Sequence, residues 1–428
     1  MATLQLVCTM LIGFAVGLPV AYSLLVPAII YLHDQHVPLF LIVQKMANGV
    51  ESFPLLAIPF FIAAGELMNT GGVTKRLVDL ASTVVGHIAG GLAHVTIVAN
   101  MIMAGMSGSA IADSAGTGRV LIPAMEQEKF SKPFAAAIVS AAGTIGPIIP
   151  PSIPFVLFGF IASTSVGRLF LGGIVPGILM GIFLMATAYI VAKKRNYPRH
   201  ARSSFREFLA ALKEASWALV MPLLILGGIL TGIFTPTEAA GVAAIYGLLV
   251  GFFIYREITV RDLLPIATRV VRSTATVLFI VAAASVLQYI FTRELVGEAL
   301  LSLFMPFVQR PFVALFLINI LFLALGCVME TTALLLLFTP IFLPLIDKLG
   351  VDRVHFGVFY ILNLMIGTLT PPVGTVMYVI LNISKISMME FTREIWPMLI
   401  ALISVLFLIT YYPPFVLYIP NLLMGVAK

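Results

Sequence analysis

Charged residues are scarce in this sequence. Asp, Glu, Lys and Arg make up 10% of the 428 residues, whereas hydrophobic residues make up 60%. A soluble protein of this length needs a far more charged surface, so the composition excludes that class. Segment after segment instead approaches the roughly 20 apolar residues that cross a bilayer. We therefore expect an all-α, polytopic membrane protein embedded in a lipid bilayer.

Cysteine and enzyme motifs are nearly absent as well. Cys8 and Cys327 lie in apolar surroundings, which predicts neither a disulfide framework nor a metal-thiolate site. The sequence has no His-Glu-x-x-His, P-loop, Gly-x-Ser-x-Gly or dinucleotide motif, so we expect no enzyme and no organic cofactor. The net charge of +6 fits the Lys and Arg surplus of cytoplasmic loops and predicts no nucleic-acid partner.

One stretch of about seventy residues occurs twice, and its landmarks are almost all glycine and proline. They recur 221 positions later: Gly105 as Gly326, Pro123 as Pro344, Gly146 as Gly367, and Pro150-Pro151 as Pro371-Pro372. Because Gly and Pro determine unusual backbone conformations, the duplicated feature is a backbone shape. It consists of a helix break, a hairpin and a second break.

The repeat divides the chain into four parts. They are residues 1–192, a first repeat with a hairpin at about 91–125 and a broken helix at about 134–163; 193–214, a basic linker; 215–234, an extra spanning helix; and 235–428, a second repeat with a hairpin at about 311–345 and a broken helix at about 355–384. Each hairpin arm is too short for a core about 30 Å thick, so the hairpins are predicted to be re-entrant. Residues 4–32 are predicted to form one spanning helix.

Lys and Arg indicate how the two repeats are oriented. The linker is the most basic polar stretch, so the positive-inside rule predicts that it is cytoplasmic. Residues 256–272 contain four arginines, whereas the matching connector, 33–51, has Lys45 alone. One extra membrane crossing between the two copies would place these equivalent connectors on opposite sides of the membrane, which explains why only one of them is rich in arginine. We therefore expect inverted repeats, which are typical of secondary transporters.

The breaks themselves predict a polar cavity, because non-helical backbone cannot face lipid. Freed carbonyls would join the hydroxyls of Ser107, Ser109, Thr331, Thr332 and Thr370. These hard oxygen ligands suit a small cation such as Na⁺, and the N-termini of half-helices suit a carboxylate. Co-transport of Na⁺ with an organic anion follows. The alternative is that the breaks are kinks satisfied by neighbouring helices.

Four ionisable residues are candidates for a role at or near this cavity. Glu330 lies at the second hairpin tip, where we expect it near substrate or cation. Asp113 is either a contact at the first tip or a partner for a helix cap. Arg293 either attracts substrate or extends to the membrane interface. Glu238 follows Thr235-Pro236-Thr237 and is better explained by helix capping.

Several motifs resemble the large membrane subunit of tripartite ATP-independent periplasmic (TRAP) transporters, the DctM-like family. They cover nearly the whole chain in order: Phe53-Pro54-Leu55-Leu56-Ala57-Ile58-Pro59, Ser107-Gly108-Ser109-Ala110 with Ala112-Asp113, Gly146-Pro147-Ile148-Ile149-Pro150-Pro151-Ser152, Gly232-Ile233-Phe234-Thr235-Pro236-Thr237-Glu238, and Gly367-Thr368-Leu369-Thr370-Pro371-Pro372. The resemblance implies a Na⁺-coupled, elevator-type importer in the bacterial cytoplasmic (inner) membrane. It implies three partners: a periplasmic substrate-binding protein, a small four-helix membrane subunit and an organic acid such as a dicarboxylate or sialic acid.

The resemblance also implies two Na⁺ sites. The first would use Ser107, Ser109, Gly146, Ile149 and Pro151, and the second would use Gly326, Met329, Thr332, Gly367 and Thr370. Substrate would lie between the hairpin tips, near Ser107, Asp113, Glu330 and Arg293. Two other hypotheses remain open. One is a self-sufficient anion/Na⁺ symporter without a binding protein, and the other is a structural anchor or channel.

Overall fold

Every regular element within the described part of the chain, residues 2–425 of a computed structural model, is a helix. The first half contains α1 (Ala2–Ala15), α2 (Val20–Asp34), α3 (Phe40–Val50), α4 (Ala57–Thr70), α5 (Val73–Val85), α6 (Gly91–Ser107), α7 (Ala110–Gln127), α8 (Lys132–Gly143), α9 (Ile153–Ile161) and α10 (Val166–Arg195). The second half contains α11 (Phe205–Leu230), α12 (Pro236–Leu249), α13 (Val260–Arg293), α14 (Val296–Phe304), α15 (Pro311–Gly326), α16 (Thr331–Lys348), α17 (Arg353–Gly367), α18 (Thr375–Ser384), α19 (Met388–Tyr411) and α20 (Pro414–Met424). Seven of the described helical segments are long and apolar enough to cross a membrane, which confirms the all-α membrane class.

A pair of consecutive helices lies at each predicted hairpin, and the two pairs keep the 221-residue register. In the first, α6 and α7 meet at Gly108, which has a positive φ of 61°. In the second, α15 and α16 meet at residues 327–330. Helix α7 covers 110–127 and α16 covers 331–348, so their bounds differ by the repeat shift at both ends.

Each predicted broken helix is interrupted where Gly and Pro cluster. Helices α8 and α9 are separated by residues 144–152, and α17 and α18 by residues 368–374. Tight turns form at equivalent places, where the Ile148 amide donates to the Ile145 carbonyl (3.0 Å) and the Leu369 amide donates to the Ile366 carbonyl (3.1 Å). The duplicated backbone shape inferred from Gly and Pro is therefore observed.

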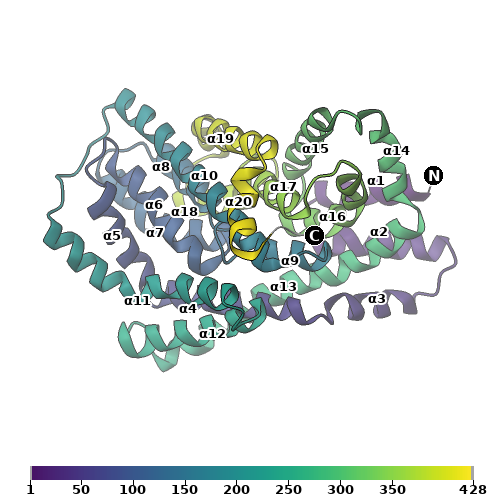
Figure 1. The fold of residues 1–428 in the computed structure, drawn as a ribbon, viewed down its shortest axis with the longest axis horizontal. Coiled ribbons are helices and arrows are strands. Elements are labelled where there is room, and N and C mark those ends of the chain that lie inside the picture. The colour runs from purple at the N-terminus through teal and green to yellow at the C-terminus, as the bar shows by residue number, and fades with distance from the viewer. Residues whose placement is uncertain (1, 426–428) are drawn as a thin grey trace.

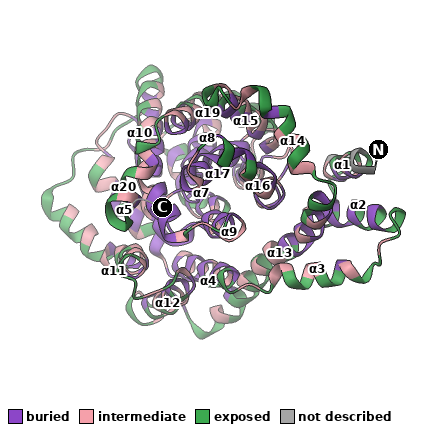
Figure 2. Ribbon diagram, turned by 45° about the vertical axis from the view of Figure 1, so that its right-hand side comes forward, coloured by how far each residue is buried: buried purple, intermediate pink, exposed green. Residues whose placement is uncertain are grey.

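The two repeats interlock at the centre of the molecule. Helix α9 of the first repeat packs against α16 and α17 of the second, and α18 packs against α7 and α8 of the first. In Figure 1, α9 accordingly lies toward α16 while α18 lies among α6, α7 and α8. Figure 2 shows that α7, α8, α16 and α17 are mostly buried. This exchange brings the breaks into the interior.

A second group of helices flanks this buried centre. Helix α4 packs against α12 and α13, α11 packs against α5 and α12, and α13 packs against α2 and α3. Their outer faces are largely exposed (Figure 2), as expected for helices that meet lipid. These flanking helices contact the hairpins, because α4 and α11 pack against α6 and α13 packs against α16.

Three boundaries differ from the sequence-based expectation. Residues 4–32 do not form one helix, because α1 ends at Ala15 and α2 packs back against it after a turn at Gly17, whose φ is 80°. Helix α11 begins at Phe205, inside the expected linker, because Ser204 and Glu207 form a capping box. The expected connector 256–272 is largely the first part of α13, which Thr259 and Asp262 cap.

Candidate functional site

The first hairpin tip rests directly on the first break. A methyl group on Gly108 would lie 2.5 Å from the Pro151 carbonyl oxygen and 3.2 Å from the Ser152 Cα. Only glycine fits this close approach, and its positive φ also favours glycine. The structure thus brings together residues that the sequence analysis took from two separate motifs.

Oxygen atoms are concentrated at this contact. The Ser107 hydroxyl donates to Asp113 Oδ1 and accepts from the Ser109 amide (3.2 Å). Ser109 caps α7, and its Oγ accepts from the Ala112 amide (3.4 Å). Hydroxyl, carboxylate and peptide oxygens are the groups that a small, hard cation prefers.

Asp113 is the main electrostatic feature of this contact. Its side chain is fully buried, and its Oδ2 has no hydrogen-bond partner among the described residues. A methyl group on Gly146 would collide with that oxygen, so the carboxylate faces the break. A buried carboxylate oxygen without a partner is costly unless a cation or proton accompanies it. The expected substrate residue Asp113 therefore lies within the first candidate cation cluster.

Ser114 belongs to the same cluster, although the sequence analysis did not select it. Its hydroxyl is buried, has no partner among the described residues and lies against Gly143. The sequence feature that could have identified Ser114 is the polar pair Asp113-Ser114, which lies early in an apolar hairpin arm. Ile149 is half-buried on the break, with its side chain against Gly177 of α10, so only its carbonyl could serve the cluster.

The second hairpin tip contacts the second break through backbone atoms. A methyl group on Gly367 would lie 2.7 Å from the Cα, C and O atoms of Gly326. The Val373 amide donates to the Cys327 carbonyl (3.0 Å), and the Thr370 hydroxyl donates to the Gly367 carbonyl (2.9 Å). Cys327 Sγ also lies 3.1 Å from Thr370 Oγ1. Gly326, Gly367 and Thr370 are therefore neighbours.

Glu330 changes the chemistry of the second tip. It caps α16 by accepting from the amides of Thr332 (2.8 Å) and Ala333 (3.2 Å). The Thr332 hydroxyl donates to Glu330 Oε1 (2.9 Å), so this expected cation ligand already has a partner. Met329 is buried beside it. The second tip therefore presents a carboxylate where the first presents Ser109.

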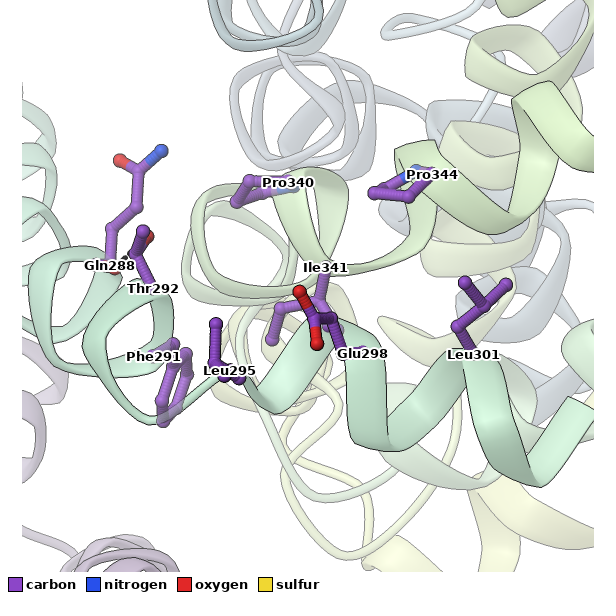
Figure 3. A pocket seen from close by; sticks show the side chains of 10 residues that line it. Gln288, Phe291, Thr292, Leu295, Glu298, Leu301, Pro340, Ile341 and Pro344 are labelled. Atoms are coloured by element: carbon purple, nitrogen blue, oxygen red, sulfur yellow. Dashed lines mark hydrogen bonds between the residues drawn. The ribbon is translucent and has the colours of Figure 1, made fainter.

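Arg293 is the last residue of α13 and is exposed. Among the described residues, no hydrogen bond or ion pair joins it to either hairpin tip. Its sequence neighbours Thr292 and Leu295 line a pocket of about 220 Å³ between α13, α14 and α16 (Figure 3). Glu298 of α14 and Pro340 of α16 also line it, so this space lies between an outer helix and the second hairpin.

Two buried amides were also missed by the sequence analysis. Asn363 of α17 donates to the side chain and carbonyl of Asn319 on α15 (both 2.9 Å), and Asn319 donates to Thr410 of α19 (3.2 Å). Asn319 and Asn363 are fully buried. In the sequence, each of these amides stands within an apolar run, and that was the signal that could have identified them. Their hydrogen bonds hold the second hairpin to the second broken helix.

Comparison with known proteins identifies a family for this arrangement. Residues 7–415 match the family described as tripartite ATP-independent periplasmic transporter, DctM component. The chain is 42% identical to the sialic acid TRAP transporter large permease protein SiaM of Vibrio cholerae, over 96% of this chain and 97% of that protein. It is 39% identical to the 2,3-diketo-L-gulonate TRAP transporter large permease protein YiaN of Escherichia coli, over 97% and 98%.

A solved structure shares the fold. The YdaH transporter of Alcanivorax borkumensis, reported with an unusual topology, aligns with a TM-score of 0.61 over 87% of each chain at 15% sequence identity. The two curated relatives are named as permease proteins rather than enzymes, in agreement with the lack of enzyme motifs.

Proposed function

This chain belongs to the DctM component family of TRAP transporters, and on that premise we propose that it couples Na⁺ entry to the import of an organic acid anion. The family places it in the bacterial inner membrane as the large permease subunit of a transporter. Na⁺ coupling, the substrate and the movement that carries it across are the parts proposed here.

The observation that carries the Na⁺ proposal is the buried oxygen cluster at the first tip. Asp113 Oδ2 faces the break at Gly146 without a partner among the described residues, and Ser107 and Ser109 lie beside it. A bound Na⁺ would offset the cost of burying this carboxylate. The Gly326–Gly367 contact would supply peptide oxygens for a second ion.

Uptake by proteoliposomes containing the partner subunits tests the coupling. We expect uptake to require a Na⁺ gradient, and uptake at full rate with no Na⁺ on either side would contradict the proposal. Ser107→Ala and Ser109→Ala should each raise the Na⁺ concentration needed for half-maximal uptake. Ser404→Ala is the matched control, since Ser404 is exposed on α19 and donates only to the Ile400 carbonyl of its own helix.

The proposed substrate is an organic acid anion, because the two relatives named above are called transporters for a sialic acid and for 2,3-diketo-L-gulonate. Both substrates are hydroxylated carboxylic acids. The N-termini of α7 and α16 at the two tips would favour the carboxylate. Competition of labelled substrate by a panel of organic acids tests this class, and competition by neutral sugars alone would contradict it.

The proposed movement is an elevator motion, in which the hairpins and broken helices shift as one block past the outer helices. The interlocking of α9 with α16 and of α18 with α7 supports movement of both repeats together. Close glycine contacts border the block, since Gly65 of α4 abuts Ser107 and Gly105 abuts Pro222 of α11. Small residues at such borders let helix backbones approach closely.

The proposed partners are a periplasmic substrate-binding protein and a small four-helix membrane subunit. The family description as one component of a tripartite transporter, and the relatives' description as large permease proteins, support this. Omitting the binding protein from the proteoliposome assay should abolish uptake. Full uptake by this chain alone would instead favour a self-sufficient symporter.

A further inference from the structure

A second cavity lies on the second repeat, and neither the hairpin tips nor the breaks line it. Its volume is about 370 Å³, and it lies between the start of α15, the connection from α16 to α17, and the junction of α19 with α20. Phe312, Val351, Asp352, His355, Tyr411 and Leu417 are among the residues that line it.

The equivalent place in the first repeat is filled. Shifting Val351, Asp352 and His355 back by 221 positions gives Phe130, Ser131 and Phe134. There the ring of Tyr197, from the linker after α10, lies 4.4 Å from the Phe130 ring and 5.3 Å from the Phe134 ring. The linker therefore plugs the first copy of the site with an aromatic side chain.

Hydrogen bonds hold Tyr197 and the following proline in this position. The Ser131 amide donates to the Tyr197 hydroxyl (3.3 Å), and that hydroxyl donates to Ser131 Oγ (3.1 Å). The amides of Gly90 (3.1 Å) and Gly91 (3.3 Å) donate to the Pro198 carbonyl. An extended Tyr-Pro segment thus supplies one phenol to the start of α8 and one carbonyl to the start of α6.

In the second repeat the matching donors are unused. Asp352 corresponds to Ser131 and Phe312 to Gly91, and neither amide has an acceptor among the described residues. Both residues are at least partly exposed, so a ligand can reach them. The Phe312 ring stacks on Tyr411 at 4.0 Å and forms one apolar wall. The open cavity therefore offers two of the three amide donors that the linker uses in the first repeat, since Pro311, which has no amide hydrogen, corresponds to Gly90.

The chain's own residue at the matching position does not fill the cavity. Tyr418 corresponds to Tyr197, but α20 carries it outward and leaves it 65% exposed. In the first repeat no such helix forms directly after α10, because Asn196 caps that helix with a positive φ of 53° and the linker then continues without helix to Ser204. Tyr418 therefore does not fill the second cavity as Tyr197 fills the first, and the occupant that we consider comes from another molecule.

We infer that this cavity is a docking site for an exposed, extended tyrosine-containing segment of a soluble protein on the periplasmic side. The side follows from the inverted repeats, since the plugged copy lies at the basic, cytoplasmic linker. The incoming phenol occupies the cavity and accepts from the Asp352 amide, and the next residue's carbonyl accepts from the Phe312 amide. This assignment rests on the family's fold and does not depend on Na⁺ coupling.

Binding of a peptide to the full chain in nanodiscs tests the inference. The probe is a fluorescent peptide with the sequence of residues 196–201, Asn-Tyr-Pro-Arg-His-Ala, and its Tyr→Ala version is the control peptide. We expect the tyrosine peptide to bind about tenfold more tightly, because the control loses a ring contact and a hydrogen bond. Both peptides carry the same charge, so nonspecific attraction to lipid cancels in the comparison.

Substitutions on α20 locate the bound peptide. Leu417→Trp fills the cavity and should remove the preference for tyrosine, and the smaller Leu417→Phe should reduce it in part. Leu422→Trp is the matched control, because Leu422 is 67% exposed on the same helix. Thermal unfolding shows which variants remain folded, and Leu417→Phe is used if Leu417→Trp does not fold.

Three outcomes would overturn the inference. The first is equal binding of the tyrosine and alanine peptides, and the second is a tyrosine preference that survives a folded Leu417→Trp variant. The third is a different occupant, seen as a concentration-dependent dimer or a co-purified lipid that Leu417→Trp removes.

Discussion

Replacing Gly367 by alanine should separate the second hairpin tip from the second break. A Cβ atom at this position would lie 2.7 Å from the Cα, C and O atoms of Gly326. Nonbonded carbon atoms normally stay at least about 3.5 Å apart, so the two backbones must move apart by about 0.8 Å. These atoms are backbone rather than the end of a flexible side chain, so no rotamer change relieves the clash.

The free energy of unfolding should fall by about 1–3 kcal/mol, the usual cost of overpacking a buried site. The movement would also lengthen the hydrogen bond from the Val373 amide to the Cys327 carbonyl, which is 3.0 Å in the native structure. If the Gly367 and Gly326 carbonyls bind Na⁺ as proposed, Na⁺ affinity should fall about tenfold for each 1.4 kcal/mol of lost binding energy.

Thermal unfolding of the purified protein in Na⁺ and in K⁺ measures both effects. Wild type should be more stable in Na⁺, because a ligand that binds only the folded state stabilises it. Gly367→Ala should lower the midpoint in K⁺ and shrink the difference between the two salts. Gly241→Ala is the control, because a Cβ there meets nothing within 4 Å. A Gly367→Ala protein with wild-type midpoints in both salts would refute the reasoning.

Three further predictions concern other parts of the structure. Asp113→Asn should weaken Na⁺ activation of uptake at least about tenfold by removing the buried charge that faces Gly146, and an unchanged Na⁺ titration would exclude Asp113 from the site. Thr235→Ala should lower stability by about 0.5–2 kcal/mol through loss of the capping box with Glu238, while the Na⁺ titration stays that of wild type. Gly297 of α14 and Ile341 of α16 line one pocket, and cysteines introduced at both positions should form a disulfide under oxidation. This disulfide should stop uptake until it is reduced, and a cross-linked protein that still transports would contradict elevator movement.

Much of the fold was predictable because Gly and Pro act locally. The breaks at residues 144–152 and 368–374 follow from clusters of Gly and Pro, whereas the isolated prolines Pro123 and Pro344 lie inside α7 and α16. The Thr235–Glu238 cap was likewise predicted from a local pattern and is present. The single helix predicted over residues 4–32 was wrong, because apolar composition does not distinguish one long helix from two packed ones.

The candidate site was predictable in part. Motif positions identified Ser107, Ser109 and Gly146, and the structure brings them together at the first tip, although their role as Na⁺ ligands stays a prediction. That Asp113 faces Gly146 depends on how the tip folds onto the break, which no spacing reveals. Thr332 shows the reverse case, because its hydroxyl is directed to Glu330 by a local contact that the family motif did not specify.

The sequence by itself determined the membrane class, the duplicated Gly and Pro skeleton and the family, because each depends on composition or on the order and spacing of residue types along the chain. Only the tertiary structure decided that α9 and α18 cross into the opposite repeat, since that packing joins helices far apart in the sequence, such as α7 (Ala110–Gln127) and α18 (Thr375–Ser384). It also decided that Tyr197 fills its site whereas Tyr418 leaves the matching one open. The two tyrosines occupy equivalent positions in the sequence, and they differ because one follows a helix end and the other lies within a further helix.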